Sequence, residues 1–194
     1  MILNLSKTKT LIYLMKIYQK YLKTFALTVF IISLSCTKEA PELVDEQELI
    51  TTVRLSIKGP NNSLQEAEWK MDAPNTSTIQ LAPQTQYEVT ISIWDESDPS
   101  DPENITNEVK SEADEHQFFY EFAGVEIDFN SATSDVVDSQ NNPLYVVSEW
   151  NTGALGEGSV QVYLIHDPTT KTSTNRAGFG GATDVQVAFD IRIE

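Results

Sequence analysis

Cysteine and histidine are scarce in this sequence. Among 194 residues there is one cysteine, Cys36, and there are two histidines, His116 and His166. A single cysteine excludes an internal disulfide bond, even in a compartment that would permit one. The 159 residues from Cys36 onward can bury an adequate core without such a bond. The folded part is therefore expected to rely on packing alone.

Sequence motifs of common catalytic sites are also absent. There is no nucleophile elbow, no H-E-x-x-H pair and no G-K-[ST] phosphate-binding run. The run GFGG at 178–181 precedes a predicted strand rather than a helix, so it indicates a turn and not a nucleotide-binding loop. We therefore expect a protein that is not an enzyme.

Acidic residues are missing from residues 1–37, which carry five lysines. An apolar run, FALTVFIISL, occupies residues 25–34. It is about half the length of the roughly 20 apolar residues that a membrane-spanning helix needs, so we favour a cleaved segment over a permanent anchor. Basic residues followed by a short apolar run predict a signal peptide over residues 1–35, with translation starting at Met1 or Met15.

Cys36 ends the stretch SLSC, which resembles the lipobox of bacterial lipoproteins. Ser35 fits the small residue before the cysteine, whereas Ser33 stands where the lipobox usually has an aliphatic residue. The resemblance implies that Cys36 is acylated and anchors the protein in the outer membrane, on its periplasmic or its cell-surface side. Residues 36–48 are polar and acidic and are predicted to form a tether. An unmodified thiol beside a cleaved leader is the alternative.

Basic residues are few after the leader. From Cys36 onward there are eight basic and 29 acidic residues, a formal net charge of −21. Such a surface repels nucleic acid and anionic membranes, so we expect no nucleic-acid partner. The acidic surface serves solubility in one interpretation and the capture of cations in the other.

Apolar and polar residues alternate with a period of two in most of the remaining chain, which is typical of strands with one buried face. Gly124 interrupts one of the stretches and is predicted to form a bulge. Together the stretches predict an antiparallel Ig-like β-sandwich of about seven strands over residues 49–194. The predicted strands are 52–58, 64–71, 87–93, 118–129, 144–150, 160–164 and 185–193.

One inserted helix is predicted at about 102–116. Asp101 can cap it, Pro102 suits its first turn, and apolar residues recur every four positions at Ile105, Val109 and Ala113. His116 then falls where the helix ends and the next strand begins.

The two histidines each stand beside carboxylates. Glu112 and His116 are four residues apart on the predicted helix, and His166 is followed by Asp167. Imidazole and carboxylate ligands suit zinc. If strands 118–129, 144–150 and 160–164 pair in chain order, however, His116 and His166 lie at opposite ends of the sandwich. A shared zinc site therefore requires a different strand order, and the alternatives are a helix-end role for His116 and a turn role for His166.

A second cluster of possible ligands is the loop DESDPSDPE at 95–103. Carboxylate oxygens in a loop can hold calcium, although this spacing is not that of an EF-hand. The two prolines and a capping role for Asp101 offer another explanation of the same composition. The acids concerned are Asp95, Glu96, Asp98, Asp101 and Glu103.

Three stretches resemble a group of small secreted Bacteroidota lipoproteins: ENITNEVKSEADEHQFFY, SEWNTGALGEGSVQVYLIHDP and GGATDVQVAFDIRI. The resemblance covers roughly residues 48–194 and implies an association with TonB-dependent outer-membrane receptors, without an assigned activity. Such proteins are often labelled as having the type 1 periplasmic binding fold. That fold needs two lobes of alternating strands and helices, which this pattern of strands with one helix does not predict.

We therefore expect a lipid-anchored accessory that binds a ligand or a receptor for TonB-dependent uptake. The alternative is a structural or adhesive surface module without a small ligand. A concave pocket with converging polar groups would favour binding, and a flat exposed face would favour adhesion.

Overall fold

The computed structural model describes residues 49–74 and 77–194, together with residues 15 and 18. Residues Gln47–Glu194 form one compact unit. Apart from residues 15 and 18, the predicted signal peptide, Cys36 and the predicted tether lie outside the described residues. Within the described part of the chain, no helix is long and apolar enough to cross a bilayer.

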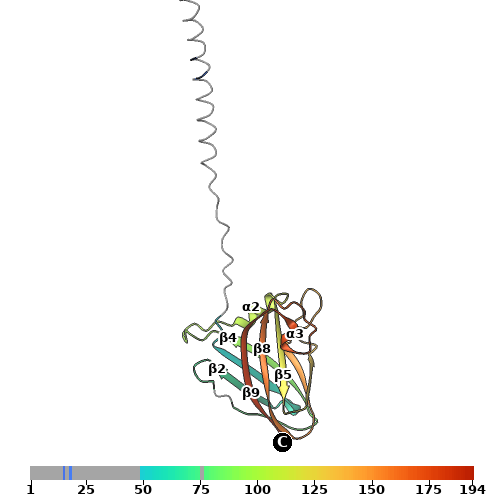
Figure 1. Ribbon diagram of the computed structural model, residues 1–194. Coiled ribbons are helices and arrows are strands. Elements are labelled where there is room, and N and C mark those ends of the chain that lie inside the picture. The colour runs from blue at the N-terminus through green and yellow to red at the C-terminus, as the bar shows by residue number, and fades with distance from the viewer. Residues whose placement is uncertain (1–14, 16–17, 19–48, 75–76) are drawn as a thin grey trace, which may run out of the picture. The chain divides into compact units, whose positions relative to one another are not determined.

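The compact unit is a β-sandwich of two sheets, as predicted (Figure 1). The five-stranded sheet has the order β2-β1-β4-β7-β6, and the four-stranded sheet has the order β3-β9-β8-β5. Neighbouring strands are antiparallel except β3 and β9, which are parallel. The strands are β1 Thr52–Lys58, β2 Leu64–Lys70, β3 Ile79–Leu81, β4 Gln86–Trp94, β5 His116–Ala123, β6 Ile127–Ser131, β7 Val147–Thr152, β8 Gly156–His166 and β9 Ala182–Ile193.

The core lies between the sheets and is built by the alternation that the sequence displays. In β9, every second residue from Val185 to Ile193 is a large apolar residue and is buried, while the residues between them are exposed. Trp150 of β7 and Tyr120 of β5 meet in the core with ring centroids 5.7 Å apart. Burying such large side chains is the main force holding two amphipathic sheets together.

All seven predicted strand regions contain observed strands. The region 118–129 contains two of them, β5 and β6, which belong to different sheets. Gly124 has a φ of 77° and lies between them, at the corner where the chain leaves one sheet for the other. The prediction of a bulge at Gly124 is therefore wrong: the residue forms a corner. Strand β3 was not predicted because three residues are too few to display a period.

The inserted helix, α2, is shorter than predicted and spans Ile105–Ser111. Its N-cap is Asn104 rather than Asp101. The backbones of Asp95 and Glu103 form two hydrogen bonds of 2.9 and 3.0 Å, which hold Glu103 in a bridge. Because residue 103 is paired in this way, the helix begins only after it. The helix ends before His116, which is the first residue of β5.

Candidate metal site

The two histidines lie side by side. In the antiparallel pair β5 and β8, His116 is directly opposite His166, and their ring centroids are 4.9 Å apart. The expectation that they lie at opposite ends of the sandwich is therefore wrong. It assumed that strands pair in chain order, but β6 and β7 belong to the other sheet, so β8 pairs directly with β5.

A third ligand-type side chain, Asp184 of β9, joins the two histidines. In β9, Val185 pairs with Leu164 and Thr183 pairs with Ile165, so Asp184 is the extra residue of a β-bulge. A bulge re-aims the side chain of the extra residue. The Asp184 side chain is 6% exposed although the alternation of β9 assigns it to the polar face. No sequence signal indicated this residue as a ligand.

We define the inner cluster as His116, His166 and Asp184. One ligand atom from each lies within 4.8 Å of the others. His116 Nε2 is 4.0 Å from Asp184 Oδ2, and His166 Nδ1 is 3.8 Å from Asp184 Oδ1. Zinc–ligand bonds of about 2.0–2.2 Å in a tetrahedron place ligand atoms about 3.4 Å apart. The two distances to Asp184 exceed this separation by about half an ångström, and no pair of the three ligand atoms is more than 4.8 Å apart, so the side chains must close by at most about 1.4 Å to hold such an ion.

The opposite nitrogen of His116 is oriented by the end of α2. His116 Nδ1 is 3.2 Å from the main-chain oxygen of Glu112, the C-cap residue. A carbonyl only accepts hydrogen bonds, so Nδ1 carries a proton, and in the neutral imidazole the lone pair is then on Nε2, the nitrogen nearer Asp184. Metal-binding histidines generally donate their second N–H in this way.

Glu112 was predicted as a metal ligand, and its carboxylate lies on the other side of the ring from Asp184. Its Oε2 is 4.0 Å from His116 Nδ1, and it belongs to neither group of metal-ligand side chains that the described residues form. The main-chain oxygen of Glu112 orients His116, and its side chain is not part of the inner cluster.

The other predicted ligand, Asp167, belongs to a second group around the same imidazole. We define the outer cluster as Glu115, His166 and Asp167, whose ligand atoms also lie within 4.8 Å of one another. Asp167 Oδ2 is 3.8 Å from His166 Nε2. Glu115 was not predicted from the sequence. Its proximity results from the pairing of β5 with β8, which aligns the residues just before and just after the two histidines.

The acids of the 95–103 loop do not belong to either of these two clusters. Among the described residues, neither group of metal-ligand side chains includes an acid of this loop. Asp95 and Asp98 accept hydrogen bonds from the backbone of Ser97 and Ser100, two residues further on. The carboxylate of Glu96 is directed away, toward Arg54. The structure thus gives no support to the predicted calcium site.

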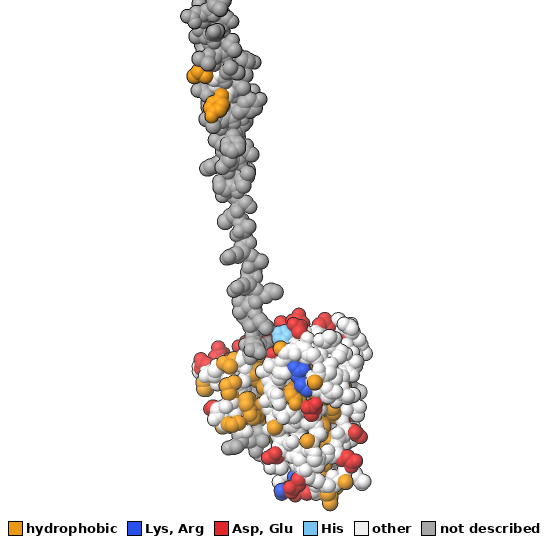
Figure 2. Space-filling view, in the orientation of Figure 1, with side chains coloured by type: hydrophobic (Ala, Val, Ile, Leu, Met, Phe, Trp, Pro, Cys, Tyr) orange, Lys and Arg blue, Asp and Glu red, His pale blue; other side chains and the backbone are white. Residues whose placement is uncertain are grey.

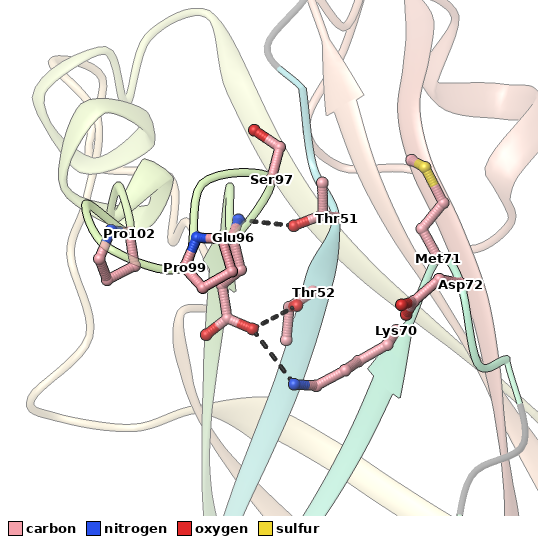
Figure 3. Close-up of a pocket in the computed structure, with 9 residues that line it drawn as sticks. All are labelled: Thr51, Thr52, Lys70, Met71, Asp72, Glu96, Ser97, Pro99 and Pro102. Carbon is pink, nitrogen blue, oxygen red and sulfur yellow. Dashed lines mark hydrogen bonds and ion pairs between the residues drawn. The ribbon is translucent and has the colours of Figure 1, made fainter.

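Glu96 instead lines a pocket of about 580 Å³ beside the ends of β1 and β2 (Figure 3). Its carboxylate accepts a hydrogen bond of 2.8 Å from Thr52 and forms ion pairs with Arg54 and Lys70. The hydrogen bond from Arg54 and then that from Thr52 lower the pKa of Glu96 from 4.5 to about 2. Glu96 and Lys70, two charged residues that line this pocket, are therefore paired with each other.

A comparison of the chain with protein-family models, curated proteins and solved structures finds no match in any of the three. The class of this protein is therefore defined by its structure alone. The chain is a β-sandwich protein in which two paired strands and a bulge of a third bring two histidines and a carboxylate together.

Proposed function

We propose that this chain is a lipid-anchored outer-membrane protein that binds a divalent transition metal, with zinc as the best fit, for TonB-dependent uptake. The observation that carries the metal assignment is the inner cluster. His116, His166 and Asp184 come from three adjacent strands, and their ligand atoms lie within 4.8 Å of one another.

The chemistry of the three donors favours zinc over calcium. Calcium takes six to eight oxygen ligands, whereas zinc is held by imidazole nitrogen and carboxylate oxygen in a tetrahedron. Two imidazoles and one carboxylate fill three positions and leave the fourth for water or for a group of a partner. Copper(II) and nickel(II) also accept imidazole ligands and are the competing metals.

The proposed location rests on the sequence. A basic and apolar leader followed by Cys36 supports a lipid anchor, and the resemblance to lipoproteins associated with TonB-dependent receptors supports a part in uptake. Of the two functions compatible with this location, the inner cluster favours binding over adhesion.

The direct test is a calorimetric zinc titration of residues 37–194 with parallel elemental analysis. This chain contains the whole compact unit Gln47–Glu194. We expect one zinc ion per chain with micromolar or tighter affinity, and weaker calcium binding. His116→Ala and Asp184→Asn should each weaken zinc binding at least tenfold.

Glu112→Gln is the matched control, because it removes a carboxylate that lies near His116 but on the other side of its ring. It should leave zinc affinity within about twofold of the wild-type value. Absence of micromolar zinc binding by the wild-type chain would refute the metal assignment. Equal losses in the Glu112 and Asp184 variants would refute the inner cluster as its location.

A further inference from the structure

We infer that the outer cluster is a loading position, at which Glu115 and Asp167 capture a divalent cation and pass it through His166 to the inner cluster. The inference rests on the proposed zinc binding at the inner cluster. It assigns a separate role to two carboxylates that the inner cluster does not use.

The first observation is that one imidazole belongs to both clusters through different nitrogens. His166 Nδ1 lies 3.8 Å from Asp184, and His166 Nε2 lies 3.8 Å from Asp167. The backbone N–H of Asp167 donates a 2.7 Å hydrogen bond to the oxygen of Glu115, which holds the outer carboxylates on neighbouring strand ends. The ring of His166 therefore stands between the inner and outer carboxylates.

The second observation is the gradient of exposure across the two clusters. The side chains of His116 and Asp184 are 3% and 6% exposed, that of His166 is 24% exposed, and that of Asp167 is 77% exposed. Within the inner cluster only His166 has appreciable contact with solvent, and it meets the solvent beside the outer acids. In Figure 2 a histidine surface lies next to acidic side chains at the end of the sandwich away from the C-terminus.

Transfer between the positions is balanced in bonds and protons. A neutral imidazole has one lone-pair nitrogen, so it binds the ion through Nε2 or through Nδ1 while the other nitrogen carries the proton. As the ion moves inward, its bonds to Nε2 and the outer carboxylates break. Bonds to Nδ1, Asp184 and His116 form, Nδ1 gives its proton to water, and Nε2 takes one up. The charge on each side of the step is the same.

The outer carboxylates should act mainly on the rate of binding. Two exposed negative charges beside the only solvent-facing inner ligand raise the local concentration of cations and replace part of their hydration shell. The same carboxylates also accept the ion when it leaves, so their removal slows release as well as capture. A transient position of this kind changes both rate constants more than it changes their ratio.

The test measures zinc association by stopped-flow competition with a fluorescent chelator, at low and at high salt. The proteins are residues 37–194 with the wild-type sequence and the double variant Glu115→Gln/Asp167→Asn. We expect the variant to bind zinc about tenfold more slowly at low salt. Its affinity should stay within about threefold of the wild-type value, because the inner ligands are unchanged.

The control is the double variant Asp101→Asn/Glu103→Gln, which removes the same charge from exposed residues of the 95–103 loop. It should bind zinc at the wild-type rate. An unchanged rate in the outer-cluster variant, an equal slowing in the control, or a loss of affinity through dissociation alone would overturn the loading position while leaving zinc binding intact. A wild-type chain that binds no zinc would overturn the proposed function and, with it, the loading position.

Discussion

His116 and His166 occupy directly opposed positions of β5 and β8, and their rings are 4.9 Å apart at one end of the sandwich. The carboxylate of Asp184 completes the cluster from β9. Side chains at opposed positions of antiparallel strands lie on the same face and within contact distance. Three neighbouring strands thus bring two imidazoles and one carboxylate together on a sheet rather than on a loop.

Zinc should stabilise the folded domain. A ligand that binds only the folded state at 100 times its dissociation constant adds about 2.7 kcal/mol to the free energy of unfolding. For a domain of this size, that corresponds to a rise in the melting temperature of about 5 to 10 °C. Differential scanning calorimetry of residues 37–194 should show this rise with zinc and its reversal with a chelator. The Asp184→Asn variant is the control: adding zinc should leave its melting temperature unchanged.

Glu96 should stabilise the domain in a pH-dependent manner. Because its pKa falls from 4.5 to about 2 on folding, its contribution is complete above pH 4.5 and is lost as the pH falls through 2. Glu96→Gln should lower the free energy of unfolding at pH 7, and the difference from wild type should shrink between pH 4.5 and pH 2. Urea unfolding of both proteins at a series of pH values measures this difference in the free energy of unfolding. Glu66→Gln, at an exposed position of β2, controls for the loss of one negative charge.

Lys171 and Asp138 form an ion pair of 3.3 Å with side chains only 8% and 4% exposed. Lys171 also donates a hydrogen bond to the main-chain oxygen of Ala113. Removing one partner leaves a buried charge uncompensated, so Lys171→Met should destabilise the domain by about 3 kcal/mol.

Denaturant unfolding should show that Lys171→Met/Asp138→Asn loses less than the sum of the two single variants. Additive losses would mean that the two groups do not interact. Lys110→Met, in the last turn of α2, is the control for loss of a lysine.

Two glycines near the start of β8 should differ sharply in their tolerance of a side chain. A Cβ at Gly158 would lie 2.0 Å from the main-chain oxygen of Ala123, whereas the nearest atom to a Cβ at Gly156 is 3.5 Å away. Gly158→Ala should therefore cost about 2 kcal/mol or more, because backbone atoms must move. Gly156→Ala should cost less than about 1 kcal/mol. Equal melting temperatures for the two variants would contradict the close approach of β5 to β8 at this corner.

Cys36→Ala should release the protein from membranes, because the proposed acyl anchor is attached to that sulfur. Immunoblotting of membrane and soluble fractions measures the change. Ser33→Ala keeps the cysteine and should leave the protein in the membrane fraction. Membrane retention of the Cys36→Ala variant would refute the lipid anchor.

The sandwich was predictable because burial of one sheet face leaves a period of two in the residues. The strands β1, β4, β8 and β9 have clear alternation, and each was found where it was predicted. The extent of α2 was overestimated because its apolar spacing continues beyond the residues that are helical. The bridge between Asp95 and Glu103, a contact between backbone groups, leaves no mark in side-chain spacing.

The sequence by itself determined that a β-sandwich forms, that its surface is strongly acidic, and that a carboxylate accompanies each histidine. Only the tertiary structure decided that the histidines meet, because alternation describes which face a residue occupies but not which strand lies beside it. The role of Asp184 depended on tertiary structure for a second reason. A bulge turns one residue against the alternation of its strand, and pairing with β8 decides where that bulge lies.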